Sequence, residues 1–238
     1  MLSSVAASGY GEFLGPLVSL LEKGGSVVGL LLVLSLAAST LVVAKLIQFV
    51  RAGIGRHARA KTAVELWRKG YMDDAYRMVA LHRSPVSDAA AHTMRGLRNP
   101  SLDKALIRED VERICLTHLN SLRSHFRALE MIAQIAPLLG LFGTVLGMIN
   151  AFQAMADAGA QVNPADLASG IWVALLTTAV GLAVAIPSSV LLTFFESRVE
   201  REQAAMELVV THLFTGAATE DDHAVVSVRE RKAKLEVA

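Results

Sequence analysis

The sequence is poor in cysteine, aromatic residues and charge. It has one cysteine in 238 residues, 5% aromatic residues and 19% charged residues, against 53% hydrophobic residues. A single cysteine excludes a disulfide scaffold, and a formal net charge of +1 with few aromatic rings excludes a nucleic-acid partner bound by a basic surface and base stacking. Soluble domains carry about 25% charged residues, so this composition favours a membrane protein.

Three long segments contain no Asp, Glu, Lys or Arg. They are residues 24–44, 131–156 and 167–195. At about 1.5 Å of rise per residue, each can cross a hydrocarbon core of about 30 Å as a helix. Buried helices of a soluble protein are the alternative, but three such runs in one small chain would leave too little polar surface. We therefore predict an all-α membrane protein with three transmembrane helices, the first of them uncleaved because no basic region precedes it.

The basic residues predict the orientation of these helices. Fifteen of the 23 Lys and Arg residues lie between Arg51 and Arg127, and six follow the third apolar segment. The positive-inside rule places this side in the cytoplasm. The predicted layout is an outer leader at 1–23, transmembrane helices at 24–50, 131–156 and 167–195, a cytoplasmic helical segment at 51–130, an outer loop at 157–166 and a cytoplasmic helix and tail at 196–238. We expect Lys45 to snorkel to the cytoplasmic headgroups.

Turn residues divide the cytoplasmic segment into helices. Short helices are expected at 60–69 and 73–82, and a third before Asn99-Pro100. From Ser101 or Asp103 no Gly or Pro appears until Pro137, which predicts one long helix running into the second span. The third span is expected to continue to about Gly216. Long projecting helices gain little stability alone, so we expect them to pack in a homo-oligomer.

Small residues recur at helical spacing in the second and third spans. The two sets are Ala136, Gly140, Gly143, Gly147 and Ala151, and Gly170, Ala174, Thr177, Gly181, Ala185 and Ser188. Each set forms one stripe that lets membrane helices approach closely, although pore lining is a second use of the same pattern. Pro137 and Pro187 predict kinks, which are either hinges or ordinary accommodated bends.

Thr144 and Thr178 flank these stripes at similar depth, near the middle of the bilayer. Each hydroxyl either bonds a carbonyl of its own helix or belongs to a polar ring that hosts water or a partner's ionisable group. The spans contain no carboxylate of their own. Because protons cross membranes through titratable groups, a second polypeptide must supply the carboxylate if this protein serves ion flux.

Signals for catalysis are weak. His118 and His125 are seven residues apart, but no acid or cysteine completes a metal-ligand spacing around them. Cys115 lacks a nucleophile motif, and no glycine-rich phosphate loop is found. We therefore expect neither a metal nor another cofactor, and no enzymatic activity. Trp172 suits an interfacial anchor near the outer end of its span.

Two stretches carry a family resemblance. Residues 132–152, IAQIAPLLGLFGTVLGMINAF, and 170–187, GIWVALLTTAVGLAVAIP, resemble the ExbB/TolQ/MotA proton-channel family, most closely its ExbB branch. The resemblance implies a homopentamer in the bacterial inner membrane, with a periplasmic N-terminus and a cytoplasmic C-terminus. It also implies a central pore that encloses two single-span helices of an ExbD-like partner, whose aspartate binds the proton, and a TonB-like protein that delivers the motion. Thr144 and Thr178 match the family's pore-facing threonines, whereas Val173 stands where many ExbB and TolQ members carry glutamate.

The expected function is that of an ExbB-like motor subunit that energises TonB-dependent outer-membrane transport. Two alternatives stay open: a TolQ-like subunit of the envelope-constriction machinery, and a non-conducting membrane scaffold. A channel that works without a partner is disfavoured because the spans hold no charge.

Overall fold

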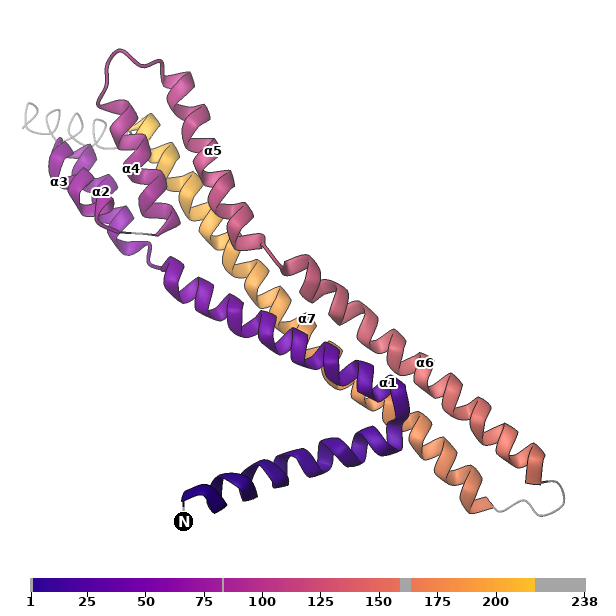
Figure 1. The fold of residues 1–238 in the computed structure, drawn as a ribbon. Helices are drawn as coiled ribbons and strands as arrows, with labels where there is room; N and C mark the ends of the chain where they lie inside the picture. Colours follow the sequence, from indigo (N-terminus) through magenta and orange to yellow (C-terminus); the bar gives the residue numbers. More distant parts are fainter. Residues whose placement is uncertain (1, 83, 159–163, 217–238) are drawn as a thin grey trace, which may run out of the picture. The chain divides into compact units, whose positions relative to one another are not determined.

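The computed structural model describes residues 2–82, 84–158 and 164–216, and these residues form helices joined by short turns, with no strand in this described part (Figure 1). The helices are α1 (Leu2–Ala52), α2 (Ala58–Arg68), α3 (Met72–Ala80), α4 (Pro85–Leu97), α5 (Lys104–Arg123), α6 (Phe126–Ala158) and α7 (Pro164–Thr215). Residues 159–163, half of the loop predicted at 157–166, and residues 217–238 of the predicted tail lie outside the described residues.

Three parts of the chain are helical, long and apolar enough to cross a membrane: Gly25–Ala52, Lys104–Asp157 and Leu167–Thr215. The predicted fold class, an all-α protein with three helices able to span a membrane, is confirmed. Large apolar side chains such as Leu138, Trp172 and Val190 are more than half exposed on α6 and α7. A monomer in water does not tolerate this much exposed apolar surface, so lipid or protein neighbours must cover it.

The short helices follow the predicted turn signals. Helices α2, α3 and α4 form near the expected positions, and α7 ends at Thr215, where Gly216 adopts a positive φ of 57°. Ser84 caps α4 by accepting the backbone N–H of Ser87, and Asp103 caps α5 by accepting that of Ala105. Each cap satisfies an otherwise unpaired N–H group of the first helical turn.

The prediction of one long helix from Ser101 into the second span is wrong. Helix α5 ends at Arg123 and α6 begins at Phe126. Between them Ser124 has an extended ψ of 142°, and His125 adopts a left-handed φ of 66°. The Ser124 hydroxyl donates to the Ser121 carbonyl oxygen at 2.8 Å. This local side-chain bond replaces helical pairing and ends the helix without Gly or Pro.

The chain divides into two compact units, and the first comprises Met1–Leu46 and His125–Phe195. Its core includes Leu31 of α1, Ala136 of α6 and Ala185 of α7. Four partly buried side chains pack against these three: Val27, Leu139, Val180 and Val184. The three apolar helices therefore share one core within this unit.

Lys45 does not snorkel as predicted. Only 3% of it is exposed, and its Nζ lies 4.9 Å from the centroid of the Phe126 ring. Phe126 in turn stacks on Phe195, with the ring centroids 6.4 Å apart. An ammonium group over an aromatic face is stabilised by the ring's negative quadrupole. The first unit therefore holds this cation by packing.

The second unit comprises Ile47–Ser124 and Glu196–Ala238. Its described part consists of the end of α1, helices α2 to α5 and the C-terminal portion of α7. Helices α4 and α5 approach closely at Gly96, where an added Cβ would lie 2.5 Å from a side-chain carbon of Ile107.

His118 does not belong to a continuous face with His125, because the helix breaks between them. Instead, Nε2 of His118 bonds Oδ2 of Asp88 at 2.8 Å.

Candidate functional site

The small-residue stripes of α6 and α7 meet along one seam. We define this seam by the residues whose backbones or Cβ positions touch across the two helices: Ala136, Gly140, Gly143, Gly147 and Ala151 of α6, and Gly170, Ala174, Thr177 and Gly181 of α7. The pairs run in opposite order along the chain, from Ala136 with Gly181 to Ala151 with Gly170. The helices are therefore antiparallel and in continuous contact.

Backbone meets backbone at the centre of the seam. A Cβ on Gly181 would lie 2.7 Å from the carbonyl oxygen of Ala136 and 3.1 Å from Cα of Gly140. A Cβ on Gly140 would lie 3.1 Å from the carbonyl oxygen of Thr177. Backbone atoms cannot yield as flexible side chains do, so glycine is required for this approach.

The seam continues to both sides with side-chain contacts. A Cβ on Gly143 would lie 2.6 Å from Oγ1 of Thr177, and a Cβ on Gly147 would lie 2.8 Å from Cβ of Ala174. Close helix contact brings hydroxyl groups of one helix within reach of carbonyl groups of the other.

Two threonines of α7 converge on one carbonyl of α6. Oγ1 of Thr178 donates to the Gly140 carbonyl oxygen at 3.2 Å, and Oγ1 of Thr177 lies 3.3 Å from the same oxygen. Thr177 also donates to the Ala174 carbonyl oxygen of its own helix at 2.7 Å and is only 2% exposed. Sequence reasoning placed Thr177 among the packing residues and missed its polar contact, because a cross-helix acceptor depends on the helix register.

Thr144 bonds within its own helix. Its Oγ1 donates to the Leu141 carbonyl oxygen at 2.6 Å, and the residue is half-buried. A hydroxyl whose hydrogen is engaged in this way still presents oxygen lone pairs as acceptors. Thr144 and Thr178 can therefore each accept a hydrogen bond from a protonated group, or turn to donate to an ionised one.

The remaining predicted positions lie around the seam. Pro137 and Pro187 are both accommodated inside continuous helices, and the kinks expected there stay a prediction. Val173 is half-buried, one residue before the seam residue Ala174, while Trp172 is 64% exposed.

Among the described residues, no group of three His, Cys, Asp or Glu side chains is arranged to hold a metal ion. Cys115 is a half-buried free thiol on α5. The chemistry that the α6–α7 pair offers is hydrogen bonding by hydroxyl groups in an otherwise apolar setting.

Comparison with known proteins places this helix pair in a family context. The family model described as the MotA/TolQ/ExbB proton channel family matches residues 82–208, which include the whole seam. An ExbB homolog of Methanothermobacter thermautotrophicus, named as a biopolymer transport protein, is 33% identical over 146 residues, which are 61% of this chain and 50% of that protein. The biopolymer transport protein exbB1 of Vibrio cholerae is 43% identical over 93 residues, 39% of this chain and 40% of the relative.

A third relative aligns over more of its length. The Tol-Pal system protein TolQ of Pseudomonas aeruginosa is 29% identical over 196 residues, which are 76% of this chain and 84% of that protein. The match to the first two relatives spans half of their length or less. Because the family model matches more than half of the chain and includes the α6–α7 seam, the chain belongs to the MotA/TolQ/ExbB proton channel family.

Proposed function

We propose that this chain is an ExbB-like subunit of a proton-driven motor in the bacterial inner membrane. The observation that carries the proposal is the pair of hydroxyl groups, on Thr144 and Thr178, beside a glycine seam in spans that hold no carboxylate. Such spans offer polar contacts along a path but no proton carrier. In this proposal the chain is a wall and not an enzyme.

The proton carrier comes from a partner. An ExbD-like single-span protein brings an intramembrane aspartate. The free-energy cost of placing this side chain in hydrocarbon is lowest when it is protonated and neutral. A protonated carboxyl group donates a hydrogen bond, and the oxygens of Thr144 and Thr178 accept one, since their own hydrogens are engaged by helix carbonyls. When the aspartate ionises, a threonine hydroxyl that rotates towards it donates instead. The same two side chains therefore serve both protonation states.

The exposed apolar faces support an assembly of several copies. Leu141, Val145 and Leu175 are half or more exposed in the single chain, and neighbouring copies and membrane lipid would cover them. We propose a homo-oligomer, a pentamer, around the partner, with the N-terminus in the periplasm and the C-terminus in the cytoplasm. A TonB-like protein would pass the resulting motion to outer-membrane transporters.

A TolQ-like role in envelope constriction is the second candidate. The alignment to a Tol-Pal system protein covers 76% of this chain, more than the alignments to the two ExbB relatives above. The two roles differ in partner rather than in the chemistry of the spans. Restoration of receptor-dependent uptake in a strain lacking its own ExbB, without restoration of a strain lacking TolQ, would support the first role.

The test of the pore role is the double variant Thr144→Val with Thr178→Val. Valine keeps the shape of threonine and removes the hydroxyl, so proton-dependent uptake should fall at least tenfold at a normal protein level; this corresponds to a loss of about 1.4 kcal/mol or more. Thr40→Val with Thr193→Val is the matched control, because both hydroxyls are exposed and bond only their own helices. Unchanged uptake in the first variant would contradict the pore role.

A non-conducting scaffold is tested separately. The purified chain is reconstituted into vesicles with and without an acid-bearing single-span partner, and the decay of a pH gradient is followed. We expect proton flux only with the partner. Flux from the chain alone would contradict a borrowed carboxylate, and an assembly that never includes such a partner would favour the scaffold.

A further inference from the structure

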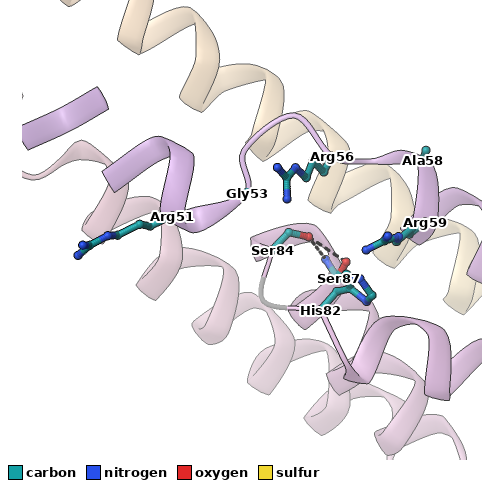
Figure 2. A pocket seen from close by; sticks show the side chains of 8 residues that line it. All are labelled: Arg51, Gly53, Arg56, Ala58, Arg59, His82, Ser84 and Ser87. Carbon is teal, nitrogen blue, oxygen red and sulfur yellow. Dashed lines mark hydrogen bonds between the residues drawn. The ribbon is translucent and has the colours of Figure 1, made fainter. Parts of the chain in front are cut away.

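The second unit contains a cavity of about 460 Å³ beside the turn that follows α1 (Figure 2). Its polar lining consists of three arginines, one histidine and two serines: Arg51, Arg56, Arg59, His82, Ser84 and Ser87. The volume lies in the range of small-ligand sites, and no carboxylate is among the described residues that line it. Neither Thr144 and Thr178 nor the glycine seam lines this cavity.

The positive charge of the cavity is not neutralised by the described residues. Among them, no ion pair engages Arg51, Arg56 or Arg59. In Figure 2 the Arg59 side chain points towards Ser87 and His82, and Arg56 lies on the same side, whereas Arg51 extends away. Arg56 and Arg59 are therefore placed to bind an anion in the cavity.

The two acidic side chains of this unit that bond histidines are committed elsewhere. Oε2 of Glu202 lies 2.7 Å from Nε2 of His57, and Oδ2 of Asp88 lies 2.8 Å from Nε2 of His118. Two guanidinium groups without a carboxylate partner repel one another unless an anion lies between them.

The wall opposite the arginines holds spare hydrogen-bonding capacity. Ser87 is only 1% exposed, and its Oγ lies 2.8 Å from Oγ of Ser84, which also accepts the N–H of Ser87. Two hydroxyl groups share this one oxygen–oxygen contact, so one hydroxyl hydrogen has no acceptor in it. Nδ1 of His82 is buried and has no hydrogen-bond partner among the described residues. Buried polar groups are normally satisfied, so these groups point to a ligand.

The first turn of α4 adds to the same wall. Ser84 is the N-cap of this 13-residue helix, and Pro85 follows it. The N-terminus of a helix carries a partial positive charge that favours anions. With the guanidinium groups of Arg56 and Arg59, it makes a site whose charge and donors match a phosphate group.

We propose that this cavity binds a phosphate group of net negative charge. Two sources share this chemistry, the headgroup of an anionic phospholipid and a soluble phosphate ester. The position of the cavity favours the lipid headgroup. Arg51 lies in the last turn of the apolar helix α1, and Gly53 is the first residue after that helix. Basic sites next to a membrane span lie at headgroup depth. The proposal is independent of the motor function, since none of its residues belongs to the α6–α7 seam.

The test uses the full chain purified in a neutral detergent. Its unfolding temperature is followed while phosphatidylglycerol, phosphatidylcholine or water-soluble glycerol 3-phosphate is added. We expect phosphatidylglycerol to raise the unfolding temperature and phosphatidylcholine, which has no net charge, to have little effect. Stabilisation by phosphatidylglycerol alone assigns the site to a lipid headgroup, and equal stabilisation by glycerol 3-phosphate assigns it to a soluble ester.

Two variants separate a built site from general charge attraction. Arg56→Gln with Arg59→Gln should raise the lipid concentration for half-maximal stabilisation about tenfold or more, since charge-assisted bonds to phosphate are lost. Lys61→Gln with Lys69→Gln removes the same charge from exposed positions of α2 and its C-cap, outside the cavity lining, and should change this concentration less than about twofold.

The proposal is overturned if neither anion stabilises the unmodified chain, or if the lysine variant loses as much as the arginine variant. Arg56 and Arg59 are exposed, so the unliganded variant should unfold at the temperature of the unmodified chain. If it does not, Arg56→Lys with Arg59→Lys keeps the charge and serves in its place. Lysine lacks the planar fork of arginine, so this variant should bind severalfold more weakly, and unchanged binding would also overturn the proposal.

Discussion

His57 and Glu202 form a partly buried hydrogen bond in the second unit, with Nε2 of His57 2.7 Å from Oε2 of Glu202. The same carboxylate oxygen accepts the backbone N–H of Gly55 at 3.1 Å, and the Glu202 side chain is only 1% exposed. A carboxylate only accepts hydrogen bonds, so Nε2 of His57 must carry the hydrogen. The pair ties the turn between α1 and α2 to helix α7.

This pair predicts a large effect of His57→Ala. The substitution leaves a buried carboxylate with one backbone donor, and Oε1 of Glu202 already has no partner among the described residues. Removing a hydrogen-bond donor from a buried carboxylate costs about 2 kcal/mol or more of unfolding free energy. Denaturant unfolding of the purified chain measures it. The control His92→Ala breaks only a 3.7 Å contact to Asp88 and should cost less than about 1 kcal/mol; equal losses would contradict the prediction.

The seam predicts that Gly181→Leu disrupts the α6–α7 pair. Even a Cβ at this position meets the Ala136 carbonyl oxygen, so a larger side chain must separate the helices. We expect a loss of about 3 kcal/mol or complete failure to assemble. The unfolding temperature and the elution volume of the purified chain report it. Ala183→Leu, on the exposed side of the same helix, should behave like the unmodified chain, and similar damage from both changes would show that the seam is not the cause.

The seam shows which features of the helix pair sequence periodicity can predict. The spacing of Gly140, Gly143 and Gly147 places small residues on one helix face whatever the partner is. The structure then pairs this stripe with the predicted stripe of α7. The hydrogen bond from Thr178 to the Gly140 carbonyl oxygen could not be predicted from the sequence, because it depends on the register between two helices and not on the pattern of either one.

Long-range packing explains the other differences. Lys45 was expected at the headgroups from its place at the end of an apolar run, but its environment is set by Phe126, which is distant in sequence. The arginines near 51–59 were interpreted as orientation signals only. The cavity that they line could not be predicted from the sequence, because it also needs Ser84 and His82, which the fold places beside them. Charge patterns predict the side of the membrane, whereas a binding site needs the tertiary contacts.

The break at His125 predicts an unusual order of substitutions. His125 has a φ of 66°, a left-handed conformation that glycine and asparagine tolerate and β-branched residues resist. We expect His125→Gly and His125→Asn to be about 1 kcal/mol or more stable than His125→Val in denaturant unfolding. At the exposed helical position Ala128 the order of glycine and valine should reverse, because glycine is the poorer helix former there. The same order at both positions would show that the backbone conformation at His125 has no influence.

A substitution at Val173 tests which side of the α6–α7 pair faces the proposed polar axis of the assembly. On α7 the exposed stripe contains Leu175, Leu182 and Ile186, while Val173 is half-buried on the side of Thr177. A glutamate facing lipid near mid-bilayer costs about 2–3 kcal/mol of insertion free energy, and one facing a polar axis costs much less. If the proposed axis lies beside the seam, Val173→Glu should accumulate in the membrane at nearly the normal level.

Leu175→Glu is the matched control for this variant, because it places the same group on the same helix but on the exposed stripe. Its membrane level, measured by quantitative immunoblotting of membrane fractions, should fall severalfold below that of Val173→Glu. A lower level for Val173→Glu than for Leu175→Glu would mean that the exposed stripe, and not the side of Thr177, faces the polar axis. The threonines at 144 and 178 would then lose their proposed role, because their hydroxyl groups lie beside the seam and could not reach a partner's carboxyl group on the opposite side.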